Sequence, residues 1–279
     1  MDIAQALAEA RRAGVARLDA QLLLAHRLGR PRAWLLAHDD SPLDAAQSDW
    51  LRAMLARRAA GEPLAYLTGE SEFCGLSLQV TPAVLVPRPE TEVLVEWALA
   101  CLPSATVAAE ASVADLGTGS GAVALALKRA RPDATLVATD LSPEALAVAA
   151  ANARRHGLAI EFAAGPWWAP LAGRRFHLVV SNPPYVAGGD PHLPALRHEP
   201  LQALTPGGDG LDALRAIVAG APGHLWPGAW LLLEHGHDQA AAVQALLVSA
   251  GFGPPETRCD LAGLPRCTGA AWPPPVGQR

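Results

Sequence analysis

The chain has 279 residues, of which 51% are hydrophobic and 18% are charged. This length exceeds the roughly 100 to 200 residues of one typical domain, and the composition excludes a disordered chain, so two folded domains are expected. The formal net charge of -5 excludes a basic field that could hold DNA or RNA unaided, because nucleic-acid affinity rests mainly on Lys and Arg at the phosphates. We therefore expect a protein or small-molecule partner and no direct binding of nucleic acid.

The start of the chain is acidic and lacks the basic and apolar regions of a signal peptide. No apolar run approaches the roughly 18 residues that a bilayer-spanning helix needs. The four cysteines include no CxxC pair, and the nine histidines show no ligand spacing. These observations predict a cytoplasmic protein with no membrane segment and no metal, and a monomer is assumed.

Residues 1–70 are predicted to form a small helical domain, because Leu residues recur there at helical spacing between capping residues. The expected helices are Ile3 to Ala13, Asp19 to Leu28, Pro31 to Ala37 and Asp44 to Ala60. Residues 71–89 are richer in Gly, Pro and β-branched residues. Apolar alternation around Leu76 to Val80, and again around Val84 to Val86, predicts a β-hairpin linker.

Residues 90–279 alternate between helical and strand patterns, which predicts parallel βαβ units in a doubly wound, Rossmann-like α/β domain. Expected strands are Val113 to Leu116, Thr135 to Thr139, Ile160 to Ala163, Phe176 to Ser181 and Ala229 to Glu234, with two weaker ones after Gly251. Expected helices run from Glu90 to Cys101, from the following Gly-rich turn through Arg129, and from a cap at Ser142. The Pro-rich end from Pro273 is expected to fray.

A Gly-rich segment follows the first of these strands and reads Asp115-Leu116-Gly117-Thr118-Gly119-Ser120-Gly121. Open α/β sheets bind nucleotides at this position, where Gly lets the backbone approach a ligand closely. Asp140 lies 19 residues after Gly121, at the end of the next strand, where its carboxylate can accept ribose hydroxyl protons. Together these features predict a cofactor that contains adenosine.

The loop by itself does not choose among adenosine cofactors. Gly117, Gly119 and Ala122 also satisfy the G-x-G-x-x-G/A pattern of dinucleotide-binding enzymes, so a pyridine-nucleotide oxidoreductase remains an alternative. A turn whose glycines only permit tight packing is the structural alternative.

The segment Asn182-Pro183-Pro184-Tyr185 follows another apolar strand, so it is expected at the same edge of the sheet as the Gly-rich loop. An amide nitrogen is a poor nucleophile because its lone pair is delocalised. The Asn182 carboxamide oxygen and a main-chain carbonyl of the Pro-Pro stretch can accept its two N-H protons and turn the lone pair toward a methyl donor. Proline holds the segment rigidly, and Tyr185 offers an aromatic face. Although such a segment can also be a plain turn, its pairing with the nucleotide loop favours methyl transfer to a planar nitrogen.

The chain resembles the glutamine-N5 methyltransferases that modify peptide chain release factors, the PrmC or HemK family, over nearly its whole length. The Asn-Pro-Pro-Tyr element is shared with adenine-N6 methyltransferases of nucleic acid, whereas residues 86–92 discriminate better between the two. The residues that carry the resemblance are Tyr66 to Gly69, Glu72-Phe73, Val86 to Glu92, residues 115–121, Ser181 to Tyr185, Glu199-Pro200, Asp209 to Leu211 and Leu233 to Gly236.

The resemblance implies S-adenosylmethionine as cofactor and the glutamine of the Gly-Gly-Gln motif of release factors as substrate. The implied cofactor-binding residues are Gly117, Thr118, Gly119, Ser120, Gly121, Asp140, Trp167 and Asn182. Asn182, Pro183, Pro184 and Tyr185 are the implied glutamine-binding residues, with Asn182, Pro183 and Tyr185 catalytic. The helical domain would help to dock the release factor.

This chain departs from the family pattern before Trp167, where an acidic residue is usual and Pro166 stands instead. Pro166 offers neither a carboxylate nor an N-H group to an adenine, so we expect the adenine to depend more on stacking against Trp167. This departure leaves a catalytically impaired release-factor binding protein as an alternative to the enzyme, beside the adenine-N6 methyltransferase and the oxidoreductase. Arg88 and Glu90 are expected to close over the cofactor, to contact the substrate protein or to form an interdomain salt bridge.

Overall fold

The computed structural model describes residues 1–103 and 111–274. The chain divides into two compact units, Met1–Glu70 and Ser71–Arg279. Of the Pro-rich end that was expected to fray, residues 275–279 lie outside the described part. Within that part, no helix is long and apolar enough to cross a membrane.

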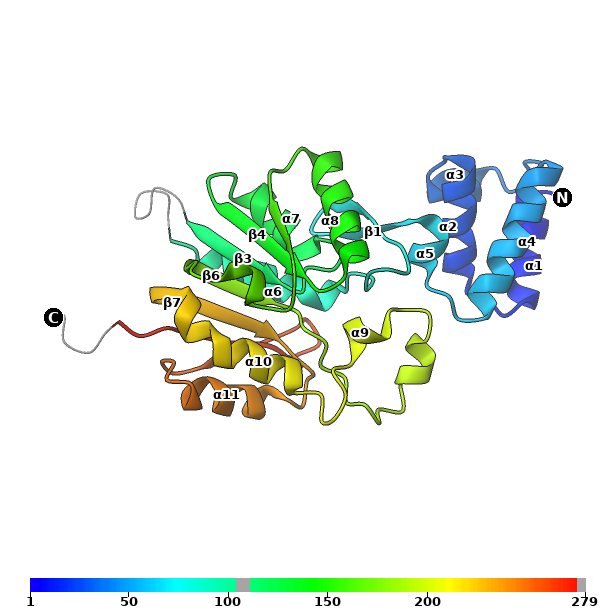
Figure 1. The fold of residues 1–279 in the computed structure, drawn as a ribbon. Coiled ribbons are helices and arrows are strands. Elements are labelled where there is room, and N and C mark those ends of the chain that lie inside the picture. The colour runs from blue at the N-terminus through cyan, green and yellow to red at the C-terminus, as the bar shows by residue number, and fades with distance from the viewer. Residues whose placement is uncertain (104–110, 275–279) are drawn as a thin grey trace. The chain divides into compact units, whose positions relative to one another are not determined.

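The first unit consists of short helices packed around a Leu-rich core (Figure 1). Its helices are α1 (Ile3–Arg12), α2 (Arg17–Leu28), α3 (Arg32–Ala37), α4 (Ala45–Ala59) and α5 (Leu64–Thr68). Asp2 and Asp44 cap α1 and α4, since each carboxylate accepts the backbone N-H three residues later. The four expected helices are therefore confirmed to within two residues at each end, and α5 is an addition.

The expected hairpin is present, and its strand around Leu76 to Val80 is confirmed, but the second strand expected around Val84 to Val86 is wrong. Strand β1 (Glu70–Phe73) pairs with β2 (Leu76–Gln79), whereas Val84 and Val86 form no strand. Three prolines between Thr81 and Pro89 lack the N-H that a ladder requires, and Val84 N instead closes a turn on Thr81 O at 3.0 Å. The apolar alternation at Val84 and Val86 reflects their burial and not a strand.

The second unit is built on a seven-stranded sheet with the order β5-β4-β3-β6-β7-β9-β8. Its strands are β3 (Ser112–Leu116), β4 (Thr135–Asp140), β5 (Glu161–Ala164), β6 (Phe176–Ser181), β7 (Leu225–Glu234), β8 (Glu256–Cys259) and β9 (Pro265–Ala271). The first five strands in this order are parallel, and β9 runs antiparallel to both of its neighbours. The doubly wound, mostly parallel sheet expected from the sequence is confirmed.

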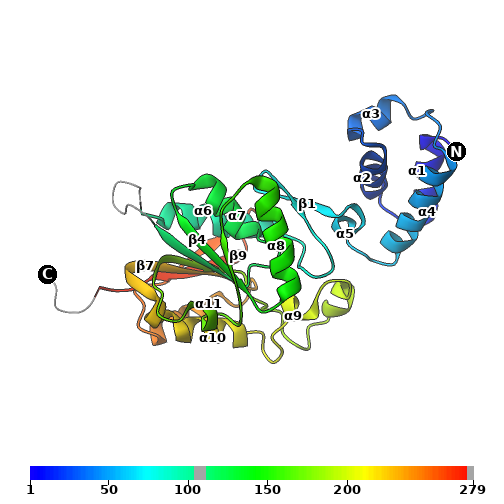
Figure 2. The same cartoon turned by 45° about the horizontal axis from the view of Figure 1, so that its top comes forward.

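Helices cover both faces of this sheet (Figures 1 and 2). Apolar side chains of α6 (Glu92–Cys101), α7 (Ala122–Ala130) and α8 (Pro143–His156) contribute to the core on one face. Those of α10 (Asp212–Gly220) and α11 (Ala240–Ser249) contribute to the core on the other face. The remaining short elements are α9 (Leu201–Leu204) and the 3-10 turns Pro89–Thr91, Ala169–Leu171, Leu193–Leu196 and Ala221–His224.

Strand β3 lies at the point where the strand order reverses. Val113 is in register with Leu136 of β4 on one side and with Leu178 of β6 on the other. The chain winds outward from β3 to β4 and β5 in one direction, and from β6 to β7 in the opposite direction. Loops that follow strands on the two sides of such a switch point separate and leave a crevice, and here those loops are the Gly-rich segment and the Asn-Pro-Pro-Tyr segment.

Candidate active site

The Gly-rich loop after β3 is held in a conformation that requires glycine. Gly117, Gly119 and Gly121 all have positive φ, at 74°, 55° and 84°. The N-H groups of Gly117 and Thr118 both donate to Thr139 O on β4 at 2.9 Å, which fastens the loop to the neighbouring strand. The loop thus curls back over the ends of two strands and begins α7 at Gly121.

Beneath this loop, Asp115 is almost completely buried and accepts a hydrogen bond from the Thr118 hydroxyl at 2.7 Å. Burial raises the pKa of Asp115 to about 6, partly counteracted by the bond from Thr118. Asp115 therefore braces the loop from below.

Asp140, at the end of β4, organises the loop directly. Its Oδ2 accepts the Gly119 N-H at 2.9 Å, and its Oδ1 accepts the Ser142 N-H at 2.9 Å. Each carboxylate oxygen keeps a second lone pair, so the same group can still accept a hydroxyl proton from a ribose. Asp140 thus has a structural task beside the expected binding task.

The two adjacent tryptophans have different environments. Trp167 is half-buried, has a positive φ of 43°, and its ring lies over Gly117, so that a Cβ on that glycine would come within 3.2 Å of Cζ3. Trp168 is buried, donates from Nε1 to Ile217 O at 2.9 Å and stacks on His224. Trp167 therefore faces the crevice, and Trp168 belongs to the core.

Asn182 follows β6 and is anchored next to the loop after β3. The hydroxyl of Ser181, the last residue of β6, donates to Leu116 O at 2.6 Å and ties the two strand ends together. The Asn182 carboxamide donates from Nδ2 to Thr91 Oγ1 at 3.2 Å. Among residues 1–103 and 111–274, no hydrogen bond is found to Asn182 Oδ1 or to the Pro183 carbonyl oxygen, so two acceptors of this segment stay available to a ligand.

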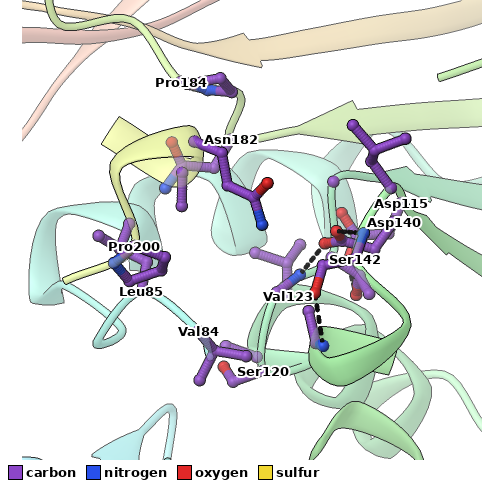
Figure 3. A pocket seen from close by; sticks show the side chains of 18 of the residues that line it. Val84, Leu85, Asp115, Ser120, Val123, Asp140, Ser142, Asn182, Pro184 and Pro200 are labelled. Atoms are coloured by element: carbon purple, nitrogen blue, oxygen red, sulfur yellow. Dashed lines mark hydrogen bonds between the residues drawn. The ribbon is translucent and has the colours of Figure 1, made fainter. Parts of the chain in front are cut away.

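Two cavities of the second unit meet at Asn182. The larger one is lined by the Gly-rich loop, Asp140 and Ser142, Trp167, and Pro184, while Figure 3 shows the Asn182 carboxamide pointing into it across from Asp140. A smaller cavity is lined by Pro183, Tyr185, Val186, Leu196 and Leu204. Leu85, Arg88, Asn182 and Ala203 line both cavities. A substrate side chain bound in the smaller cavity would therefore lie next to Asn182, which separates it from the larger cavity.

Tyr185 lines the smaller cavity and not the larger one. Its hydroxyl donates to Glu234 Oε1 at 3.3 Å, and its carbonyl oxygen accepts from Gln239 Nε2 at 3.0 Å. Burial raises the pKa of the Tyr185 hydroxyl, so it stays neutral at physiological pH. The aromatic face of Tyr185 can contact a group in the smaller cavity, but its position does not favour contact with the cofactor loop.

Three supporting residues in this region were not identified from the sequence as members of the site. Asn152 on α8 is fully buried, accepts Gln79 N at 2.7 Å, and donates to Gln79 O and Ser120 O at 2.9 Å each. The side chain of Glu199 is buried, pairs with Arg88 and accepts Val86 N at 3.1 Å. Thr91, which holds Asn182, is the third.

The sequence held only partial signals for these residues. Asn152 is the one polar residue in the stretch from Ala149 to Ala153, and residues 86–92 and Glu199-Pro200 carry the family resemblance without indicating that they touch. Arg88 pairs with Glu199 within the second unit and also lines the larger cavity, so it forms an ion pair beside the proposed cofactor site.

Two families of domains match this chain. The PrmC N-terminal domain matches residues 2–69, and the methyltransferase small domain matches residues 91–211. Among solved structures, the chain resembles a methyltransferase from Pyrococcus furiosus with a TM-score of 0.52 at 15% identity, over 72% of this chain and 90% of that chain. It also resembles the catalytic domain of hMettl16 with a TM-score of 0.59 at 14% identity, over 81% of this chain and 83% of that chain. These likenesses show the fold.

A doubly wound sheet with a Gly-rich loop, a carboxylate after the next strand and an Asn-Pro-Pro-Tyr segment around one crevice is typical of the S-adenosylmethionine-dependent methyltransferases, the class to which this chain belongs. The release factor glutamine methyltransferase of Xylella fastidiosa (strain Temecula1) is 52% identical over 257 residues, covering 91% of this chain and 92% of that protein. The protein of the same name from Burkholderia pseudomallei is 52% identical over 265 residues, with 92% of each chain covered. The chain belongs to the family of release factor glutamine methyltransferases.

Proposed function

We propose that this enzyme transfers the methyl group of S-adenosylmethionine to the side-chain amide nitrogen, N5, of the glutamine in the Gly-Gly-Gln motif of peptide chain release factors. The observation that carries the proposal is a pair of available acceptors: Asn182 Oδ1, on a residue that lines both cavities, and the carbonyl oxygen of Pro183, which lines the smaller one. A primary amide has two N-H protons, and two fixed acceptors can bind both of them.

Binding both N-H protons makes the amide nitrogen, a weak nucleophile, more reactive in two ways. It holds the amide plane in place, so that the nitrogen lone pair can be turned toward the larger cavity. It also stabilises the positive charge that develops on nitrogen as the new bond forms, because the two acceptors carry partial negative charge and are held in place before the reaction. The extra proton can then leave to water, and we assign no general base. Pro183 and Pro184 keep the acceptors in place since they fix φ.

The residues of the larger cavity fit S-adenosylmethionine. Gly117, Thr118, Gly119 and Ser120 line the cavity and provide backbone that a ligand can approach closely, and Asp140 can accept ribose hydroxyl protons. Gly121, also expected at the cofactor, does not line the cavity: it caps α7 and packs against Leu125 and Ala149. Trp167 offers an indole face for the adenine. When bound, S-adenosylmethionine supplies a methyl group on a positively charged sulfur, which is a reactive electrophile. The Asn182 side chain lines this cavity as well and is therefore proposed to contact both reactants.

The same proposal assigns the substrate to a protein and not to a nucleic acid. The relatives in this family are named for release factors, and the net charge of -5 gives no support to direct nucleic-acid binding. Family membership also argues against a pyridine-nucleotide oxidoreductase. Such an enzyme would have no use for the segment from Asn182 to Tyr185. We propose that residues 1–70 act as a docking domain for the release factor, that residues 71–89 serve as a linker, and that the enzyme works in the cytoplasm.

The proposal is tested with labelled S-adenosylmethionine and a purified release factor, followed by mass spectrometry that locates the label. Wild-type protein should label the glutamine of the Gly-Gly-Gln motif, and Asn182→Ala should lower kcat by about 100-fold or more with S-adenosylmethionine affinity changed far less. Gln244→Ala, which removes a side-chain amide outside both cavities, should leave kcat unchanged. Wild-type protein that leaves this glutamine unlabelled contradicts the proposal and favours a binding protein without turnover.

A further inference from the structure

The carboxamide of Asn182 can face the substrate with either its oxygen or its NH2 group, and a neighbouring residue must determine which. The oxygen and the NH2 group of an asparagine have nearly the same shape, and a half turn about the last side-chain bond exchanges them. Only the orientation with Oδ1 toward the substrate accepts an N-H proton, whereas the reverse orientation places a donor there. In the structure Nδ2 is bound to Thr91 Oγ1, so the neighbour that decides the orientation is Thr91.

Thr91 is buried, with only 4% of its surface exposed, at the end of the 3-10 turn before α6. Its hydroxyl carries one proton and can therefore donate to one partner while it accepts from another. It accepts from Asn182 Nδ2 at 3.2 Å, and it lies close enough to the buried carboxylate of Glu234 to lower the pKa of that group. The hydroxyl is thus placed between an amide and a carboxylate.

Glu234 ends β7 and is 1% exposed. Its Oε1 accepts the Tyr185 hydroxyl at 3.3 Å, while Oε2 is buried and has no hydrogen-bond partner within the described parts of the chain. The charged and titratable groups that act on Glu234 are Tyr185 after β6, Arg266 on β9 and Glu90 in the turn before α6, and the thiol of Cys267 on β9, the cross-strand partner of Glu234, also interacts with it. Of the neighbours that act on Glu234, Thr91 is the one that also binds Asn182, and among the described residues no other acceptor is found for its hydroxyl proton.

We propose that Thr91 and Glu234 are positioning residues that set the hydrogen-bond direction of Asn182, so that Oδ1 and not Nδ2 meets the substrate amide. An ionised carboxylate only accepts hydrogen bonds, so Thr91 must donate to Glu234. The hydroxyl oxygen of Thr91 then has only lone pairs left for Asn182, which must present Nδ2 to it. This inference rests on the proposed methylation of a glutamine amide.

Protonation of Glu234 allows the hydrogen bonds from Glu234 through Thr91 to Asn182 to form in the opposite direction. The protonated acid can donate to Thr91, whose own proton then turns toward Asn182 and binds Oδ1. Burial raises the pKa of Glu234 to about 7, with Thr91, Arg266 and Tyr185 acting against the increase and Glu90 adding to it. The productive orientation belongs to the ionised form, so kcat should rise with pH through this range.

The experiment measures kcat, KM for the release factor and affinity for S-adenosylmethionine in four full-length variants. Thr91→Val keeps the shape but removes the hydroxyl, and Thr91→Ser restores it. Glu234→Gln gives its oxygen to the Tyr185 hydroxyl and so presents its NH2 group to Thr91, which reverses the direction. Thr257→Val is the matched control, because it removes a hydrogen-bonded hydroxyl that lies outside both cavities.

We expect Thr91→Val and Glu234→Gln to lower kcat by about tenfold or more while cofactor affinity stays within about threefold of wild type. Thr91→Ser should recover most of the rate, Thr257→Val should match wild type, and the rise of kcat with pH near 7 should vanish in Glu234→Gln. An active wild-type enzyme whose Thr91→Val variant keeps its kcat overturns the inference alone. A serine variant as slow as the valine variant, or a pH profile unchanged in Glu234→Gln, overturns it too. Wild-type protein that labels no glutamine overturns the proposed function, and the inference with it.

Discussion

The indole ring of Trp167 lies so close over Gly117 that a Cβ on this glycine would come within 3.2 Å of Cζ3. Gly117 also has a φ of 74°, which a residue with a side chain adopts at a cost. The first turn of the nucleotide loop and the proposed adenine-stacking ring therefore fit together only because residue 117 has no side chain. Their fit connects the conformation of the loop with the position of the ring.

Gly117→Ala should destabilise the cofactor-free protein more than Gly119→Ala. Both changes put alanine at positive φ, which costs about 1 to 2 kcal/mol, but only the first also pushes against Trp167, since a Cβ at Gly119 meets nothing within 4 Å. Urea unfolding should therefore show a loss for Gly117→Ala that is greater by about 1 kcal/mol. Equal losses in the two variants would show that the ring moves aside freely.

Asn152→Ala should be among the more damaging single changes away from the reacting groups. It leaves Gln79 N, Gln79 O and Ser120 O without their buried partner, and the expected loss of unfolding free energy is about 3 kcal/mol. Because Ser120 belongs to the nucleotide loop, affinity for S-adenosylmethionine should fall as well. Unfolding in urea and calorimetric titration measure the two effects.

Gln79→Ala is the matched control for this change, because Asn152 binds only the main chain of Gln79 and the Gln79 side chain is exposed. It should leave both the stability and the affinity near their wild-type values. A comparable loss in Gln79→Ala would mean that β2, and not the buried amide, is the sensitive element.

Local patterns in the sequence were sufficient for the parts of the site that follow single strands. The Gly-rich loop after β3 and the segment from Asn182 to Tyr185 after β6 have residue types that only their local conformation and chemistry explain. The rule that parallel strands bring such loops to one edge then placed them together correctly. The sequence predicted the two sides of the crevice for this reason.

The supports of the site are different, because they join segments far apart in the chain. Thr91 and Asn182 are separated by 91 positions, and Val86 and Glu199 by 113. Nothing in the local pattern around either member of a pair specifies the other, since their hydrogen bond depends on where the whole sheet places them. The same limit explains the wrong strand at Val84 and Val86, where burial in the folded protein produced an alternation that resembles a strand.

The stability of the cofactor-free protein should depend on pH through Glu234. In the unfolded chain this carboxyl group has its ordinary pKa of 4.5, whereas burial raises its pKa in the folded protein to about 7. Between these values the folded protein binds more protons than the unfolded chain, so raising the pH favours unfolding. The penalty is absent below the lower pKa and complete above the upper one.

Glu234→Gln removes this penalty, so the variant should gain stability relative to wild type as the pH rises from about 4 to 8, by roughly 3 kcal/mol in total. Urea unfolding at a series of pH values measures the difference. Glu96→Gln makes the same chemical change at an exposed position of α6 and should give no such trend. A pH-independent difference between wild type and Glu234→Gln would contradict the buried, proton-binding carboxyl.

Pro166 offers a test of how the adenine is held. It is exposed, lines the larger cavity next to Trp167, and offers neither a carboxylate nor an N-H group to a ligand. Pro166→Asp should supply an acceptor for the adenine amino group and tighten S-adenosylmethionine binding by about tenfold, because a hydrogen bond to a charged group contributes at least about 1.5 kcal/mol. Pro166→Ala removes the ring without adding a carboxylate and should leave the affinity close to wild type. If calorimetry finds the same affinity for the aspartate and alanine variants, the missing carboxylate does not limit binding, and the contact between the adenine and Trp167 is sufficient without it.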